Sequence, residues 1–334
     1  MRQVLGRLYG AAARRRRAWY AARPDARRRL TRPVVSVGGI SVGGSGKTPI
    51  AAEVARLLVT LGERPAILSR GYARADPVDG VVVVRDHDRV RGDLATAGDE
   101  PWMLAGRLDG VAVVVAADRY LAGRLAETRL GSTVHLLDDG FQHLRLERSL
   151  DLVVLRPEDL DDAVLPAGRL REGPQAVRAA DAVLVVGADE AGGAAVAARL
   201  GIATPFGVVM ALAPPQAGAG PLQAGTPVFA VAGIARPGRF FDDLRAIGFP
   251  PAGTARFPDH HRFTGADVTR IQRRAREAGC AAIVTTEKDA VRLAGRAPLD
   301  PPLAVSALST RITPQDRFQA LLADRVAGAR AGAA

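Results

Sequence analysis

The sequence predicts an α/β protein with a doubly wound parallel sheet as its core and a second, smaller α/β domain. Between residues 34 and 186, short apolar runs of strand type alternate with segments of helical periodicity, as expected for strands joined by covering helices. A stretch rich in Ala, Gly and Pro, 188–226, is followed by a second strand–helix series. We therefore predict a basic helix at 1–30, a core domain at 31–206, a smaller domain at 207–311, and a C-terminal helix within 312–334 that docks on either domain.

Residues 1–30 form a basic amphipathic segment. They contain ten arginines and one acid, Asp25, and so carry +9 of the formal charge of +11. Leu5, Leu8 and Tyr9 would share one face of a helix. Apolar side chains beside dense arginine predict a helix that lies on an anionic membrane surface. A nucleic-acid-binding arm, a transit peptide and a solvated basic tail are the alternatives.

The stretch 33–58 has the form of a phosphate-binding loop. An apolar run, 34–37, leads through a glycine-rich turn to Lys47 and Thr48, and a helix with apolar residues at helical spacing follows. Glycines let backbone N–H groups turn toward an anion, and the helix N-terminus adds partial positive charge. We expect Lys47 to reach the β- and γ-phosphates of a nucleotide and the Thr48 hydroxyl to bind Mg²⁺. The sequence thus predicts a P-loop NTPase-like core with the nucleotide-binding residues Ser41, Gly43, Gly44, Ser45, Gly46, Lys47 and Thr48, where Ser41 replaces the usual first glycine.

The other elements are predicted from short apolar runs and from helical spacing. In the core domain, further strands are expected at 65–68, 81–84, 111–115, 134–137, 152–155 and 182–186, with a helix from 119 to about 128. In the rest of the chain, strands are expected at 228–231, 281–285 and 303–307, and helices at 239–247, 266–278 and 314–327.

Two pairs of adjacent acids lie beside these elements. Asp99 and Glu100 precede a proline, so they indicate either a helix cap, with the proline at the first helical position, or a general base beside a metal ligand. Asp138 and Asp139 end an apolar run, the form of a Walker B segment whose aspartate holds Mg²⁺. Turns also favour Asp, but the phosphate loop upstream favours the metal interpretation.

Basic side chains single out two further stretches. Of the 46 basic residues only Lys47 and Lys288 are lysine, and a compact ammonium in the phosphate loop is not replaceable by a planar guanidinium. Lys288 is therefore of interest, although the sequence assigns it no role. The loop Leu165–Glu172 contains Arg169 and Arg171, which would clamp a phosphate or simply face solvent.

The smaller domain carries two adjacent histidines, His260 and His261, in the loop Phe257–Phe263. No cysteine or third histidine is near in sequence, so a general base or proton relay is favoured over a metal site. Helix capping by Asp259 with packed histidines is the alternative. The one cysteine, Cys280, excludes an internal disulfide and a cysteine-based zinc site and is compatible with a reducing cytoplasm, and no apolar run reaches the ~18 residues of a membrane span.

Seven stretches, taken in order, resemble the tetraacyldisaccharide 4′-kinase family of lipid A biosynthesis. They are Ser41–Thr48, Ser69–Tyr72, Gly98–Pro101, Asp138–His143, Leu165–Glu172, Phe257–His261 and Thr285–Asp289. The family carries a phosphate loop of the form S-x-G-G-x-G-K-T, which Ser41 matches.

The resemblance implies a lipid kinase that transfers the γ-phosphoryl group of ATP to the 4′-hydroxyl of a tetraacyldisaccharide 1-phosphate, giving lipid IVA. It implies ATP and Mg²⁺ as cofactors, and an active site in a cleft between the two domains. The implied catalytic residues are Asp99 as base or orienter, His260 as its partner, Lys47, Arg171 and, more weakly, Arg119. His260 is preferred to His261 because the family motif is Asp-His. The implied metal ligands are Thr48, Asp138 or Asp139, Glu100 and Gln142.

The implied partners are the acylated glycolipid and the cytoplasmic face of the bacterial inner membrane, contacted peripherally through residues 1–30. We expect a monomer and no nucleic-acid partner. The competing functions are a soluble P-loop kinase of a small sugar or nucleoside, a GTP-dependent switch or metallochaperone, and a nucleic-acid-binding ATPase. A guanine-reading [NT]-K-x-D motif is absent at Lys288-Asp289, where the two residues are adjacent.

Overall fold

The computed structural model describes residues 1–43, 46–72, 74–76, 78–218, 220–293, 295 and 298–331. The chain forms two compact units, the first of Met1–Val209 with Thr310–Ala334 and the second of Met210–Ser309. Strand β8 (Pro205–Leu212) leads from the first unit into the second, and β15 (Leu308–Thr313) leads back. The C-terminal helix α10 (Gln315–Ala331) therefore belongs to the first unit.

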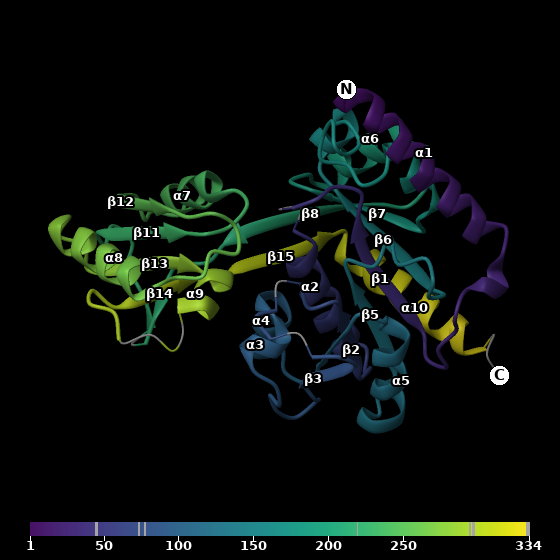
Figure 1. Cartoon of the computed structure of the whole chain (residues 1–334), viewed down its shortest axis with the longest axis horizontal. Coiled ribbons are helices and arrows are strands. Elements are labelled where there is room, and N and C mark those ends of the chain that lie inside the picture. The colour runs from purple at the N-terminus through teal and green to yellow at the C-terminus, as the bar shows by residue number, and fades with distance from the viewer. Residues whose placement is uncertain are drawn as a thin grey trace. The chain divides into compact units, whose positions relative to one another are not determined.

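The first unit is built on a nine-stranded sheet with the order β15-β8-β7-β6-β1-β5-β2-β4-β3 (Figure 1). The strands from β8 to β4 in this order are parallel, and β3 at the edge runs antiparallel to β4. This sheet confirms the predicted α/β class. Besides β8 and β15, its strands are β1 (Val34–Gly39), β2 (Pro65–Ser69), β3 (Val81–Arg85), β4 (Ala112–Ala116), β5 (Val134–Asp138), β6 (Leu150–Leu155) and β7 (Ala182–Val186).

Helices cover both faces of this sheet, which explains why its central strands are apolar on both sides. On one face, α5 (Arg119–Leu130) and α6 (Glu190–Leu200) pack on alternate residues of the strands, among them Leu137 and Val153. On the other face lie α2 (Lys47–Thr60) and α10. Ring contact between Phe318 of α10 and Phe206 of β8, with centroids 5.0 Å apart, fixes the C-terminal helix there.

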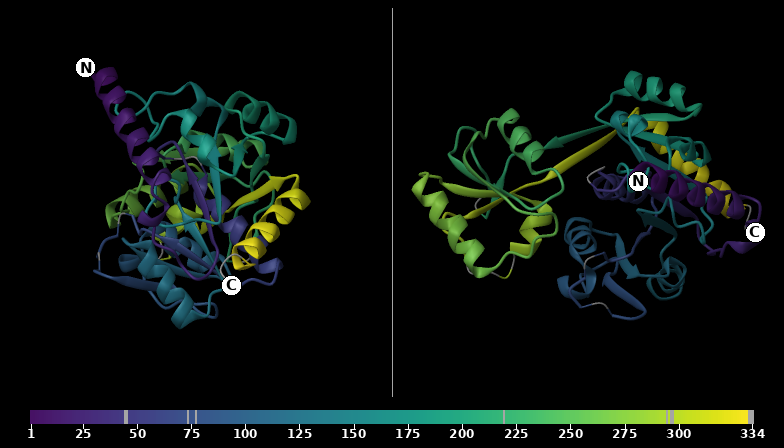
Figure 2. Two further views of the ribbon diagram at one scale, coloured as in Figure 1. Left: turned by 90° about the vertical axis from the view of Figure 1, so that its right-hand side faces the viewer. Right: turned by 45° about the horizontal axis from the view of Figure 1, so that its top comes forward.

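Helix α1 (Arg2–Ala21) confirms the helix expected near the N-terminus, and its buried face is made of glycine. Gly6 and Gly10 are its buried residues, and a Cβ on Gly6 would lie 3.0 Å from the Val164 carbonyl oxygen. The apolar side chains point away from the protein: Val4 is 60% and Leu8 is 64% exposed. Figure 2 shows α1 and α10, at the two ends of the colour scale, both lying against the first unit. Within the described residues, no helix combines the length and apolarity needed to cross a membrane.

The second unit contains a six-stranded sheet with the order β10-β9-β14-β13-β11-β12. The four longer strands are parallel, and two apolar clusters, rich in phenylalanine, pack on its faces. Buried Cys280 belongs to one of these clusters. The strands are β9 (Gln216–Ala217), β10 (Gly220–Pro221), β11 (Val228–Ala232), β12 (Pro251–Arg256), β13 (Ala282–Thr286) and β14 (Leu303–Ser306), and the helices are α7 (Pro237–Ala246), α8 (Gly265–Glu277) and α9 (Glu287–Leu293).

Candidate active site

The phosphate loop and the paired aspartates meet at one edge of the first sheet. Strands β1 and β5 are parallel neighbours, with Val37 opposite Asp138 in register. The loop after β1 and the acids after β5 therefore emerge side by side at the carboxyl ends of the strands, where ligands bind in open α/β sheets. Gly46, in the left-handed conformation at φ 82°, precedes the first turn of α2, which contains Lys47 and Thr48. Gly44 and Ser45, two of the predicted nucleotide-binding residues, lie outside the described residues.

Lys47 occupies the centre of this edge. Its Nζ donates to the backbone oxygen of Ser41 at 3.2 Å and lies 3.3 Å from Oδ1 of Asp139. Burial would raise the pKa of Asp139, but the charges of Lys47 and Arg171 outweigh it and lower that pKa. Asp139 is thus an anion that holds two cations near the phosphate loop.

Asp138 is suited to a metal ion. Its side chain is 4% exposed, and its Oδ1 is buried without a hydrogen-bond partner. Burial, with repulsion from Glu100 and Asp139, raises the pKa of Asp138 to about 8. Mg²⁺ takes oxygen ligands and relieves such clustering of carboxylates, so these residues fit the ion. In the described part of the chain, no three His, Cys, Asp or Glu side chains lie close enough together to form a metal-binding group by themselves.

Asp99 and Glu100 begin α4 (Asp99–Arg107). The N-cap is Gly98 at φ 86°, so the prediction that an acid caps this helix, with proline at the first helical position, is wrong. Only glycine adopts this backbone easily, and a Cβ there would lie 2.8 Å from the Tyr72 carbonyl oxygen. The two carboxylates therefore lie within the first turn of the helix, and Glu100 is close enough to Asp138 to raise its pKa.

The loop Leu165–Glu172 is attached to the phosphate loop by backbone hydrogen bonds. Val42 N donates to the Arg169 oxygen at 2.9 Å, and Arg171 N donates to the Ile40 oxygen at 2.6 Å. This pairing brings the Arg171 guanidinium to Asp139 Oδ2 at 2.6 Å. Ser41 is buried here, and its hydroxyl donates to Asp159 at 3.3 Å, so its side chain supports the loop from within.

A chain of contacts runs from this loop to helix α1, which sequence patterns did not indicate. Gln142 Nε2 donates to the Gly39 oxygen and to Glu172 Oε1, both at 3.0 Å. Glu172 in turn accepts two bonds of 2.7 Å from Arg17, whose guanidinium also covers the ring of Phe141 at 4.0 Å. The arginine cluster of α1 thus includes one residue that is anchored to the site.

Arg119 stands near the paired aspartates, and His143 stands near Arg119. Arg119 lies buried at the start of α5. Burial and repulsion from Arg70 lower its pKa, and attraction to Asp138 and Asp139 offsets only part of that shift. Burial and the neighbouring Arg119 lower the pKa of His143 to about 4, so this imidazole is neutral at pH 7. The sequence named the stretches that contain Arg70 and His143 but gave these two residues no role.

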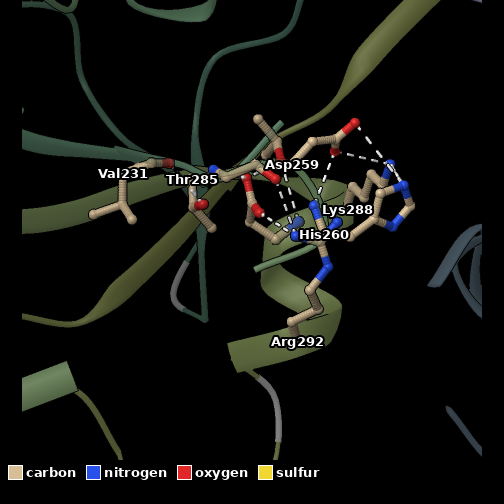
Figure 3. Close-up of polar contacts among 9 residues, drawn as sticks. Val231, Asp259, His260, Thr285, Lys288 and Arg292 are labelled. Atoms are coloured by element: carbon tan, nitrogen blue, oxygen red, sulfur yellow. Dashed lines mark hydrogen bonds and ion pairs between the residues drawn. The ribbon is translucent and has the colours of Figure 1, made fainter. Parts of the chain in front are cut away.

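The histidine loop belongs to the second unit, between β12 and α8. His261 is used in packing: it stacks on Phe257 at 4.7 Å, and its Nε2 lies 3.0 Å from Asp267 Oδ2 at the N-terminus of α8. His260 instead lies beside Lys288 of α9, with Nζ and Nε2 3.2 Å apart (Figure 3). The two adjacent histidines therefore have different surroundings, and only His260 is next to a cation in this way.

Two residues have unusual backbone conformations. Among the described non-glycine residues, only Asp139, at φ 55°, and His260, at φ 60°, have positive φ. Asp and His tolerate this region better than most residues, but it still costs about 1–3 kcal/mol when enforced. Such strain concentrates at functional sites, and here it falls on two residues that the sequence singled out.

Comparison with known proteins gives a consistent result. The family model of the tetraacyldisaccharide-1-P 4′-kinases matches residues 2–327. A tetraacyldisaccharide 4′-kinase of Geobacter metallireducens is 41% identical over 298 residues, which cover 87% of each chain. One of Anaeromyxobacter dehalogenans is 44% identical over 291 residues, covering 82% of this chain and 74% of that protein. The crystal structure of LpxK from Aquifex aeolicus in complex with ATP is 30% identical, with a TM-score of 0.78, and the match covers 96% of this chain and 97% of that one.

Proposed function

This chain belongs to the tetraacyldisaccharide-1-P 4′-kinase family, and from that premise we propose how it works. It transfers the γ-phosphoryl group of ATP to the 4′-hydroxyl of a tetraacyldisaccharide 1-phosphate, giving lipid IVA in lipid A biosynthesis. The observation that carries this proposal is the meeting of Lys47, Asp138, Asp139 and Arg171 at one edge of the first sheet, beside a phosphate loop.

Phosphoryl transfer depends on positioning and on neutralising charge more than on covalent chemistry. Lys47, which now pairs with Asp139, would exchange this partner for oxygens of the β- and γ-phosphates. Backbone amides of the phosphate loop and the N-terminus of α2 would hold the same phosphates. Arg171, and more weakly Arg119, would stabilise the charge on the transferred group.

Mg²⁺, when bound, would neutralise negative charge on the phosphates during transfer. Thr48 and either Asp138 or Asp139 would hold it, with Glu100 and Gln142 as further oxygen donors. The orphaned Oδ1 of Asp138 and the raised pKa of this carboxyl support the assignment.

Asp99 is the proposed base or orienter for the 4′-hydroxyl. It lies in the first turn of α4. His260 is the second proposed catalytic residue, and the structural use of His261 supports the choice of His260. A carboxylate that accepts the hydroxyl proton and an imidazole that orients it would together serve as the general base.

We further propose that α1 docks on the cytoplasmic surface of the inner membrane, and that the protein works there as a peripheral monomer. The helix presents exposed Val4, Leu5, Leu8 and Tyr9 on one side, within a segment whose ten arginines suit anionic lipid. An apolar helix face left in contact with water indicates an interaction surface.

The test is transfer of labelled phosphate from ATP to a tetraacyldisaccharide 1-phosphate, separated by thin-layer chromatography. We expect a labelled lipid product with the purified chain and none without Mg²⁺. Transfer to a small soluble sugar or nucleoside but not to the glycolipid would favour the soluble kinase, and a preference for GTP would favour the switch protein. Either result contradicts the proposal.

A further inference from the structure

We propose that Lys288 is a positioning residue that fixes the tautomer of His260. Nζ of Lys288 lies 3.2 Å from Nε2 of His260 and 3.3 Å from Oδ1 of Asp259. An ammonium group has three donors and no acceptor, so the nitrogen that it bonds must offer a lone pair. Nε2 is then the acceptor, and the neutral imidazole carries its proton on Nδ1. This assigns a role to the second of the chain's two lysines.

The position of Lys288 is set by buried bonds on both sides of it in sequence. The Thr286 hydroxyl donates to Asp289 Oδ2 at 2.8 Å and accepts from the Asp289 backbone N–H at 3.1 Å. Asp289 is fully buried and also accepts from Gly233 N at 2.9 Å and from Arg292 at 3.0 Å. The start of α9 is therefore tied to the carboxyl end of β11, and Lys288 is held on a rigid element.

The position of His260 is equally determined by its loop. Its left-handed backbone follows Asp259, whose Oδ1 accepts the His260 backbone N–H at 3.0 Å. The same carboxylate reaches Lys288, and its Oδ2 lies 3.9 Å from Nε2 of His260. Figure 3 shows Asp259, Lys288 and His260 facing one another. The carboxylate thus orients the ammonium group that bonds the ring.

The consequence for the reaction rests on the proposed function. With Nε2 engaged as an acceptor, the hydrogen of the neutral ring is on Nδ1, so any hydrogen bond that the neutral His260 ring donates in the reaction comes from Nδ1. The other tautomer would place a hydrogen of Nε2 against the ammonium, which has no lone pair to accept it. Lys288 therefore acts on the reaction only through the orientation and proton position of His260.

The direct test is the tautomer itself. In uniformly ¹⁵N-labelled protein at pH 8, long-range ¹H–¹⁵N spectra distinguish protonated from unprotonated ring nitrogens, and His260→Gln identifies the resonances among those of the five histidines. We expect unprotonated Nε2 in the full-length protein, and a shift toward the Nε2–H form in Lys288→Met. Lys288→Arg should keep the original form, because guanidinium is also only a donor. Protonated Nε2 in the unmodified chain, or no change in Lys288→Met, would overturn the proposal.

The second readout is kinetic. Lys288→Met should lower kcat by about 10- to 100-fold, the size of loss found when the group that orients a metal-ligating imidazole is removed, with KM for ATP changed less than about twofold. Arg245→Met, which removes an exposed ion pair with Asp242 from the same unit, is the matched control and should keep kcat. An unchanged kcat in Lys288→Met overturns the positioning role. This outcome differs from a failure of the proposed function. In that case the unmodified chain would phosphorylate no glycolipid, but the tautomer of His260 could still be measured by NMR.

Discussion

Substitution of Glu172 tests whether one arginine of α1 is a structural anchor. The Arg17 and Glu172 side chains are only 14% and 7% exposed, and they form a bidentate pair. Glu172→Gln leaves the arginine charge largely desolvated, and breaking one partner of a buried pair costs about 3–5 kcal/mol. We expect about 3 kcal/mol, the lower end of that range, because Arg17 keeps the Phe141 carbonyl at 3.3 Å and the Phe141 ring. For a unit of this size, that loss corresponds to roughly 6–12 °C in melting temperature.

The assay is thermal unfolding followed by circular dichroism, with hydrogen exchange along α1 to locate the loss. Glu147→Gln breaks a bidentate pair between Glu147 and Arg29, which are 37% and 70% exposed, so it is the matched control and should change the melting temperature far less than Glu172→Gln does. The double variant Arg17→Met/Glu172→Gln removes both charges and should recover at least half of the loss. Equal effects of Glu172→Gln and Glu147→Gln, or no recovery in the double variant, would refute the reasoning.

Three further predictions concern turnover, membrane contact and acid stability. Lys47→Ala and Asp99→Ala should each lower turnover on the glycolipid at least ~100-fold while the fold is retained, as followed by circular dichroism; near-normal turnover in either removes that residue from the mechanism. Val4→Gln/Leu8→Gln should weaken sedimentation with anionic vesicles, most clearly at low salt, without altering stability; unchanged sedimentation argues against docking through α1. Backbone N–H donation from Thr264 and the contact with His261 lower the pKa of Asp267 below 3.8, so its stabilisation is present above about pH 4 and is lost as pH falls. Asp267→Asn should therefore cost more stability at pH 7 than at pH 2, as followed by urea unfolding at each pH; a pH-independent difference would contradict this assignment.

The buried strands were the most predictable part of the fold. The predicted runs 34–37, 65–68, 111–115 and 182–186 all became central strands with ends within two residues of those expected. Such strands are covered on both faces, so apolarity alone reveals them.

Elements with few large side chains were missed. Helix α6 lies in the Ala-, Gly- and Pro-rich stretch 188–226, where we predicted no helix, because its sequence EAGGAAVAARL packs through small residues. Strand β12, PAGTAR, has one buried residue, and β15 alternates exposed and buried positions. Their hydrogen bonding is decided by neighbouring strands, which a local pattern does not contain.

The site was predictable where chemistry follows a strand end. Lys47 and the paired aspartates could be assigned to one site from the sequence. Each follows a strand, and the carboxyl ends of parallel strands lie at one edge of the sheet. It did not indicate Arg17 with Glu172, whose positions differ by 155 residues, nor the contact of Lys288 with His260. Those contacts depend on how a surface helix and a loop pack, and no periodicity encodes that.

The two faces of helix α1 can be distinguished by mutagenesis. Its protein-facing side is glycine, and its outward side is Val and Leu. In a saturation-mutagenesis library, variants with a larger residue at Gly6 should be depleted by a screen for folded protein. Variants with a polar residue at Val4 or Leu8 should pass that screen. They should be lost only when cell growth depends on the enzyme. Two selections applied to a single helix would then separate what the polypeptide needs in order to fold from what the bacterium needs it to do.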